Sequence, residues 1–345
     1  MPRIVAFGTA VPDADVHDVY ADWARRQVMG TRQAAVLDRM IERGGIDHRF
    51  SVLSQADARL GPDSFYTAYA APTTAQRMDH YAASAPALAE AAVQKLPSLE
   101  GVTHIITASC TGFMAPGLDQ VLARQLGLAA DVQRLSIGFM GCYAGITLLR
   151  TAAQIVRADP AARVLAIAVE LCTLHMQETD ALEPLLAMGQ FADGAAATLV
   201  CAEGEGMSLG ESLSTTLPGS DDLITWHVGD TGFTMHLSGE VPGRLAQALS
   251  DSDLRDRLAL SDDTALAVHP GGKSILDAVE RALDLDRQAL GPSRDILRRF
   301  GNMSSATVIF VLEQFARKRP ADGLALAFGP GLAMEGLRFG WADDA

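Results

Sequence analysis

Three stretches set the pattern of this chain: IIT at residues 105–107, GLDQVLARQL at 117–126 and RVLAIAV at 163–169. The first and third are short apolar runs of strand length, whereas the second spaces its apolar residues as a helix does. Strands that alternate with longer helical patterns are typical of α/β proteins. We therefore expect an α/β architecture.

A second series of the same kind follows the glycine-containing stretch at residues 204–210. It comprises a strand at 265–268, helices at 273–283 and around 304–317, and a strand at 323–328. Two successive units indicate an internal duplication, so we place a boundary near residue 205, between halves 1–205 and 206–345. Between the two series, Gly229, Gly232, Gly239 and Pro242 predict strands and turns rather than helix.

The composition indicates a soluble globular protein. At 345 residues and 48% hydrophobic content, the chain can bury a large core. Its net charge of −14 disfavours nonspecific binding to nucleic acid and stable association with an anionic membrane. No apolar stretch approaches the roughly 20 residues of a membrane helix. The four cysteines show neither CxxC spacing nor a preceding secretory signal, so we expect reduced thiols, no zinc site and a cytoplasmic location.

Cys142 stands in the stretch FMGCYAG at residues 139–145, directly before a helical pattern at 146–156. A cysteine at a helix start feels the positive end of the helix dipole and free backbone N–H groups, both of which favour the thiolate. We therefore expect the pKa of Cys142 to fall below the free value of roughly 8.5. The alternative is a small buried apolar side chain, the commoner role of a single cysteine.

Two further residues could take part in the same chemistry. His269 follows the apolar run 265–268 and precedes Pro270, where a buried strand ends and a tight loop begins; side chains at such strand ends commonly line sites. Asn302 precedes an apolar stretch at 306–309. Taken singly, the histidine could lie on the surface and the asparagine could simply cap a helix.

Together, Cys142, His269 and Asn302 supply a nucleophile, an imidazole and a neutral amide donor. This set suits carbon–carbon bond formation. The thiolate carries an acyl group, and the other two residues hydrogen-bond the enolate oxygen that forms when a malonyl thioester loses carbon dioxide. A cysteine protease uses similar residue types, but the sequence does not resemble the local cysteine signatures of the papain-like or caspase families.

Three motifs resemble those of the chalcone-synthase-like enzymes, which are type III polyketide synthases: GCYAG at 141–145, HPGG at 269–272 and GNMSS at 301–305. The similarity covers nearly the whole chain, including FADGAAA at 191–197 and FGPG at 328–331. The resemblance implies a thiolase-type αβαβα fold with two pseudo-duplicated halves, and a homodimer. It implies acyl-CoA and malonyl-CoA as substrates, no metal or organic cofactor, and catalytic roles for Cys142, His269 and Asn302.

The resemblance also assigns residues to the substrate cavity. Phe191 matches a gatekeeping phenylalanine whose apolar face would lie near the malonyl carboxylate and disfavour its charged form. Met235 stands where the family carries a second phenylalanine and offers a more adaptable wall.

Four other cavity residues follow from the same comparison. Cys110 and Cys172 take positions where plant members carry threonine, and we expect them chiefly to fill space as small hydrophobes. Glu170 and Ser304 match residues that hold a water able to select aldol ring closure, a relay that Cys110 interrupts. The mode of cyclisation is therefore open.

Arg39 and Arg43 lie four residues apart on a helical pattern, so they share a face that could clamp a pyrophosphate or form an ordinary solvated surface. They align with the family's basic CoA-binding positions, with Arg49 nearby. By the same resemblance, Gly271 and Ser274 would touch the pantetheine arm.

The segment TWHVGD at 225–230 and the residues after it resemble bacterial enzymes that make alkylpyrones or alkylresorcinols from fatty acyl-CoA. Trp226, however, lies where plant enzymes have glycine, and its ring could shrink the pocket toward malonyl, as a tyrosine is thought to do in tetrahydroxynaphthalene synthases. We expect an aliphatic starter, with a malonyl-primed synthase of small aromatic polyketides as the alternative. A ketoacyl-carrier-protein synthase with a single condensation and a noncatalytic acyl-CoA-binding protein are the other rivals.

Overall fold

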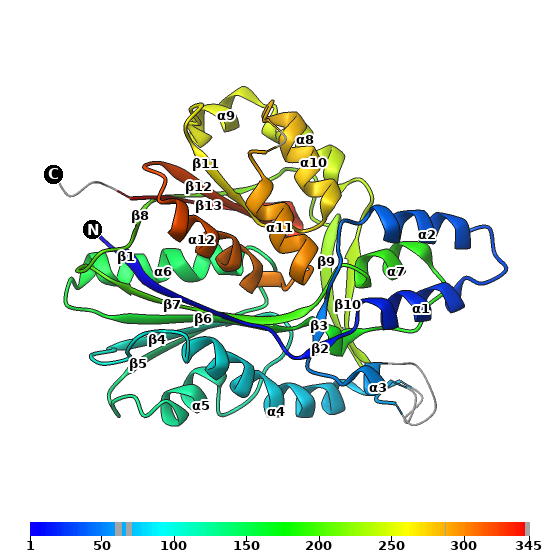
Figure 1. The fold of residues 1–345 in the computed structure, drawn as a ribbon, viewed down its shortest axis with the longest axis horizontal. Coiled ribbons are helices and arrows are strands. Elements are labelled where there is room, and N and C mark those ends of the chain that lie inside the picture. The colour runs from blue at the N-terminus through cyan, green and yellow to red at the C-terminus, as the bar shows by residue number, and fades with distance from the viewer. Residues whose placement is uncertain (59–63, 67–70, 287, 342–345) are drawn as a thin grey trace.

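Helices and sheet alternate in five layers in the computed structural model, which describes residues 1–58, 64–66, 71–286 and 288–341 (Figure 1). One outer layer contains α4 (Thr74–Val93) and α5 (Leu118–Gln125). The central layer contains α6 (Ala144–Ala158) and α12 (Thr307–Lys318). The other outer layer comprises α8 (Val241–Leu249), α9 (Ser252–Leu258), α10 (Lys273–Ala282) and α11 (Gly291–Phe300). The thiolase-type αβαβα prediction is confirmed.

Nine strands form the sheet, in the order β11-β12-β13-β8-β1-β7-β6-β4-β5. Their bounds are β1 (Arg3–Ala10), β4 (His104–Ser109), β5 (Gln133–Gly138), β6 (Val164–Leu171), β7 (Asp193–Cys201), β8 (Met207–Thr216), β11 (Ala265–Val268), β12 (Gly323–Gly329) and β13 (Ala333–Gly340). The two halves of the sheet meet where β1 pairs with β8, with Ile4 opposite Met207. Each half then forms its own layer around the central helices (Figure 1).

The central strands owe their composition to this layering. β6 and β7 are buried at every position, because α4 covers one face and α6 or α12 the other. Strands buried on both faces read as continuous apolar runs, which is why RVLAIAV was recognisable as a strand. By contrast, β5 lies at the edge of the sheet and exposes most of its residues.

The helices and strands predicted from the sequence are present with small shifts at their ends, including the helix after Cys142, which is α6. Pro242, expected in a turn, instead lies in the first turn of α8, where a proline needs no backbone N–H. Residue 205 lies in the turn between β7 and β8. Strand β1 lies between β7 and β8 and pairs with both, so the sheet is continuous across this boundary. The division into two halves stays a prediction.

A smaller group of elements extends from one end of the layers (Figure 1, right). It comprises α1 (His17–Gln27), α2 (Ala34–Arg43), α7 (Leu182–Met188), the short paired strands β2 (Ala14–Asp15) and β3 (Phe50–Ser51), and the hairpin of β9 (Ile224–Gly229) and β10 (Gly232–Leu237). α3 (Gln55–Ala58) follows β3. Within the described ranges, no helix has the length and apolar character needed to cross a bilayer.

Candidate active site

Cys142 lies in a tight turn between β5 and α6 and is 7% exposed. The preceding Gly141 has φ +78°, and a Cβ there would come within 2.3 Å of Pro330 Cδ, so glycine is required for both conformation and space. The Gly141 N–H donates to Cys110 Sγ at 3.0 Å. Cys110 therefore does more than fill space, because its sulfur also fixes the backbone beside Cys142.

The pKa of Cys142 is raised to about 11, chiefly because burial disfavours the thiolate. Hydrogen bonds from Ser304 and Asn302 lower the pKa, and the charge of Glu170 raises it, but burial dominates. Our expectation of a lowered pKa is therefore wrong. The helix start is present, but desolvation outweighs it, and Cys142 rests as a neutral thiol.

His269 follows the last residue of β11, as predicted, and is 1% exposed. Its backbone N–H donates to Leu326 O at 2.7 Å, which ties it to β12. Neither ring nitrogen has a hydrogen-bond partner among the described residues. Burial lowers the pKa of His269 to about 3, so the imidazole is neutral at physiological pH.

Asn302 reaches the site from the turn between α11 and α12. Its side-chain Oδ1 accepts the Ser304 N–H at 2.9 Å, and its Nδ2 donates a long hydrogen bond to Gly271 O at 3.4 Å. Its backbone forms a parallel bridge with Phe191. Ser304 has φ +46°, an uncommon conformation for a residue with a side chain, and such strain is often stored at functional sites.

Cys142, His269 and Asn302 line a single cavity of about 310 Å³, which we call the catalytic cavity. A second cavity of about 280 Å³, the side cavity, lies next to it. Phe191, Trp226 and Met235 line both. Trp226 and Met235 face each other across the β9–β10 hairpin. The three side chains thus separate the two cavities, and both cavities are mainly apolar.

The remaining predicted cavity residues divide between these spaces. Cys110 and Ser304 line the catalytic cavity, and Cys172 lines the side cavity. Glu170 is fully buried and accepts hydrogen bonds from the Cys110 N–H (2.9 Å), the Thr111 hydroxyl (2.8 Å) and the Ser305 hydroxyl. The water expected between Glu170 and Ser304 stays a prediction; the Ser305 hydroxyl contacts Glu170 directly, and the Ser304 hydroxyl bonds to Cys142.

The proposed CoA residues differ in exposure. Arg39 and Arg43 are exposed on α2 and Ser274 is exposed on α10, whereas Gly271 lines the catalytic cavity. Arg49 is 2% exposed, and its Nη1 donates to the carbonyl oxygens of Phe191 (2.9 Å) and Met188 (3.2 Å). Its assignment to CoA is therefore wrong, because a phosphate cannot reach a guanidinium that lies inside the protein.

His175 is a site residue that the sequence analysis missed. Its Nε2 lies 2.6 Å from Thr111 O, and its Nδ1 accepts the Phe233 N–H at 3.1 Å, so the proton sits on Nε2. Its ring stacks on Phe233 at 4.1 Å. Burial lowers the pKa of His175 to about 4. This neutral histidine fastens the β9–β10 hairpin to the core, a role for which the local sequence carries no signal.

Among residues 1–58, 64–66, 71–286 and 288–341, no group of three or more histidine, cysteine or acidic side chains could hold a metal ion.

Comparison with known proteins matches the chain to two family models. Residues 2–204 match the N-terminal domain of the chalcone and stilbene synthases, and residues 208–340 match their C-terminal domain. A curated relative, probable polyketide synthase 1 of Dictyostelium discoideum, is 36% identical over 252 residues, or 68% of this chain. That match spans only 8% of the relative's own length.

Solved structures resemble the chain over almost its full length. The C-terminal type III polyketide synthase domain of Steely1, a type I/III hybrid from Dictyostelium, has a TM-score of 0.88 and 27% identity, with 99% of each chain covered. PKS-I from the brown alga Ectocarpus siliculosus also scores 0.88 at 27% identity, covering 99% of this chain and 98% of its own. CsyB, whose structure was solved with CoA-SH, has a TM-score of 0.82 and 24% identity, with 99% of this chain and 100% of CsyB covered, and it resembles this chain in fold.

Proposed function

Because the chain belongs to the chalcone and stilbene synthase family, we propose that it is a type III polyketide synthase that extends an acyl group on Cys142 by repeated condensation with malonyl-CoA. It would thus act as an acyltransferase. The observation that carries this proposal is the convergence of Cys142, His269 and Asn302, from three distant parts of the chain, on one cavity.

In the loading step, the neutral imidazole of His269 accepts the Cys142 proton as the sulfur attacks the carbonyl carbon of an acyl-CoA. The bond from that carbon to the CoA sulfur breaks, and CoA leaves as a thiol with the proton returned by His269. Cys142 and His269 line the same cavity, and both groups are uncharged before the substrate arrives.

In the condensation step, malonyl-CoA loses carbon dioxide and the electron pair stays as an enolate. An N–H of His269 and the Nδ2 of Asn302 donate hydrogen bonds to the enolate oxygen. The enolate carbon attacks the thioester, the carbon–sulfur bond to Cys142 breaks, and the thiolate is released. The product is a CoA thioester two carbons longer, which returns to Cys142 for the next extension.

We propose an aliphatic acyl-CoA as the starter, and a pyrone or resorcinol-type product. The side cavity supports this choice, because its lining is mainly apolar and it adjoins the catalytic cavity at Phe191, Trp226 and Met235. A chain bound at Cys142 could extend past these side chains into it. The closest alternative is priming by malonyl-CoA, which the bulk of Trp226 between the cavities favours.

CoA binding is proposed at the surface near α2. Arg39 and Arg43 are both exposed, and guanidinium groups bind phosphates well. Gly271, two residues after His269 at the catalytic cavity, permits a pantetheine arm to pass close to the backbone, and Ser274 is exposed in the first turn of α10. The CoA complex of CsyB agrees with this substrate class. No metal or organic cofactor enters the proposed steps, and a reducing cytoplasm would preserve the Cys142 thiol.

We also propose a homodimer that forms at the β5 edge. β5 ends the sheet, so one side of its backbone is open to a further strand. Leu135, Phe113 and Phe139 are 44%, 54% and 48% exposed, and exposed apolar side chains of this size mark interaction surfaces. Light scattering on Leu135→Glu, with Arg134→Glu as a matched control, should show a monomer for the first variant. A monomeric wild-type protein would rule out the dimer.

The test of function is to incubate the enzyme with malonyl-CoA and a panel of short, aromatic and long-chain acyl-CoA starters, and to identify products by mass. Long-chain pyrones or resorcinols support the aliphatic starter, whereas product from malonyl-CoA alone supports the alternative. Cys142→Ala should abolish product while leaving CoA binding largely intact. Chains extended only once would favour a ketoacyl synthase, and no condensation with any starter would reject the proposal.

A further inference from the structure

Arg49 is a buried cation with an unusual set of partners. Nη1 donates to the carbonyl oxygens of Phe191 and Met188, Nε donates to His17 Nδ1 at 3.2 Å, and the guanidinium lies 4.5 Å from the centre of the Tyr20 ring. Among the described residues, Arg49 forms no ion pair with a carboxylate, and its Nη2 is buried without a hydrogen-bond partner. Burying a charge without such a partner is costly, so this arginine needs an explanation other than charge pairing.

The carbonyls that Arg49 holds belong to Met188, the last residue of α7, and to Phe191 in the turn between α7 and β7. The same turn binds Asn302 from its other side: the Asn302 N–H donates to Gln190 O at 2.8 Å, and the Ala192 N–H donates to Asn302 O at 2.9 Å. Residues 188–192 are therefore clamped between Arg49 and the backbone of Asn302. Any shift of this turn would move Phe191 and the amide donor together.

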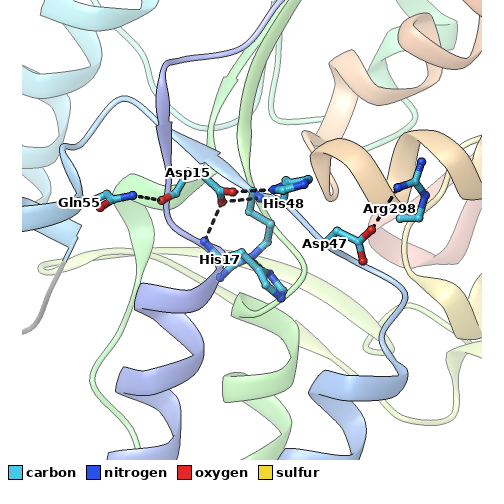
Figure 2. A network of polar contacts seen from close by, with 7 residues as sticks. Asp15, His17, Asp47, His48, Gln55 and Arg298 are labelled. Atoms are coloured by element: carbon cyan, nitrogen blue, oxygen red, sulfur yellow. Dashed lines mark hydrogen bonds and ion pairs between the residues drawn. The ribbon is translucent and has the colours of Figure 1, made fainter.

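The segment that carries Arg49 is itself fixed at several points, shown in Figure 2. Asp15 Oδ1 accepts the backbone N–H groups of His17 (3.1 Å) and Arg49 (3.2 Å), while Oδ2 lies 2.7 Å from His48 Nδ1. Farther along, Asp47 pairs with Arg298 at 3.1 Å, and its N–H donates to Arg298 O at 2.7 Å. Arg298 is on α11, the helix that leads into Asn302.

We propose that Arg49 is a positioning residue for the condensation. It holds Phe191 and Asn302 in the geometry in which the enolate, once formed, attacks the thioester on Cys142. This rests on the function proposed for Asn302. An arginine suits the task because its rigid planar fork can serve two carbonyl oxygens and a ring nitrogen at once, whereas lysine offers a single point charge. Displacements of about 1 Å in such a site can cost about 100-fold in rate.

The test compares Arg49→Lys with Arg77→Lys. Arg77 is an equally buried arginine, 1% exposed, that donates to the carbonyl oxygens of Pro72 (3.0 Å), Met176 (3.0 Å) and Leu174 but does not contact the Phe191 turn. Both variants should lose thermal stability. Arg49→Lys alone should lower kcat about tenfold or more with little change in KM, and raise the ratio of acetyl-CoA released to polyketide formed.

A second readout does not depend on activity. Hydrogen exchange should become faster at the amides of residues 190–192 and 302 in Arg49→Lys, and stay as in the wild type there in Arg77→Lys. If both variants give the same product ratio and the same exchange pattern, the proposal is overturned. If the wild type condenses no starter, the proposed function fails, but the exchange comparison still tests the positioning role.

A milder pair covers the case in which Arg49→Lys does not fold. His17→Leu removes the acceptor of the Nε hydrogen bond, whereas His17→Asn keeps an acceptor in that region. We expect His17→Leu to shift the product ratio and the exchange in the same direction as Arg49→Lys, and His17→Asn to restore values near the wild type. Wild-type values for His17→Leu would overturn the proposal.

Discussion

Trp226 on β9 stands directly opposite Met235 on β10, and both side chains border the catalytic cavity and the side cavity at once. Phe191 completes this partition from the other side of the site. The volume open to a growing chain is therefore set by three side chains that lie outside the reaction centre.

Replacing Trp226 by alanine should merge the two cavities. The removed ring leaves space between them, so activity should shift by tenfold or more toward long-chain acyl-CoA starters relative to short ones, since each buried CH₂ is worth about 0.8 kcal/mol. Competition assays with mixed starters, read by product mass, measure this shift. Thr225→Ala, on the neighbouring exposed position, is the matched control and should leave the selectivity unchanged.

The rate of Cys142 alkylation should not level off near pH 8.5. Because the pKa of this thiol is raised to about 11, the thiolate fraction and the rate with iodoacetamide should rise about tenfold per pH unit between pH 7 and 10. Peptide mapping separates Cys142 from Cys110 and Cys172, whose pKa values burial raises well above the ordinary range. A rate that levels off below pH 9 would contradict the raised pKa.

Condensation should not lose activity as the pH falls through 6.5. His269 acts as a neutral imidazole, and burial lowers its pKa to about 3, so it stays uncharged in mildly acidic buffer. We expect kcat/KM to show no histidine-type acid limb between pH 7 and 5.5. His269→Ala and Asn302→Ala should each lose about 100-fold or more in kcat, the usual cost of removing an oxyanion donor. A clear inflection near pH 6.5 in the wild type would argue against the neutral role.

Folding stability should fall as the pH drops from about 6.5 to about 4. His175 and His269 are held neutral, with pKa values of about 4 and about 3, whereas in the unfolded chain they bind protons near pH 6.5. The unfolded state therefore takes up more protons in this window, and each histidine contributes about 1.4 kcal/mol per pH unit. Asp193, whose pKa burial raises to about 6, opposes this slope between about pH 4 and 6.

The variant His175→Asn isolates the contribution of His175 to the pH dependence of folding stability. Urea unfolding of the wild type and the variant at pH 5 and pH 6 should give a pH dependence that is weaker by about 1.2 kcal/mol in the variant over this unit, since the unfolded histidine is only partly protonated at pH 6. Comparing slopes removes the constant cost of the lost hairpin contacts. Parallel pH dependences would show that His175 does not titrate as its burial implies.

The fold and the reactive residues could be predicted because both depend on local pattern. The runs at 164–169 and 265–268 are apolar throughout because helices cover both faces of their strands. Cys142, His269 and Asn302 follow or precede elements whose ends the sequence marks. The family resemblance then fixed their roles as expectations, and the shared cavity supports them.

The errors concern burial, which neighbouring residues along the chain do not reveal. Arg49 follows a polar segment that reads as surface, but the turn after Met188 packs over it. The pKa of Cys142 depends on how many distant segments exclude water from the thiol, and the local helix start could not predict that. Ser304 and Ser305 are adjacent, and the sequence did not indicate that Ser304 takes a left-handed backbone conformation and that the Ser305 hydroxyl contacts Glu170.

The β9–β10 hairpin forms a two-stranded sheet of its own, apart from the nine strands of the layers. Two of the three side chains that separate the cavities, Trp226 and Met235, are thus carried on a segment that can mutate without altering the central layers, where Cys142, His269 and Asn302 lie. A lineage of such enzymes could diversify its products by exchanging hairpin sequences while inheriting the same reaction unchanged.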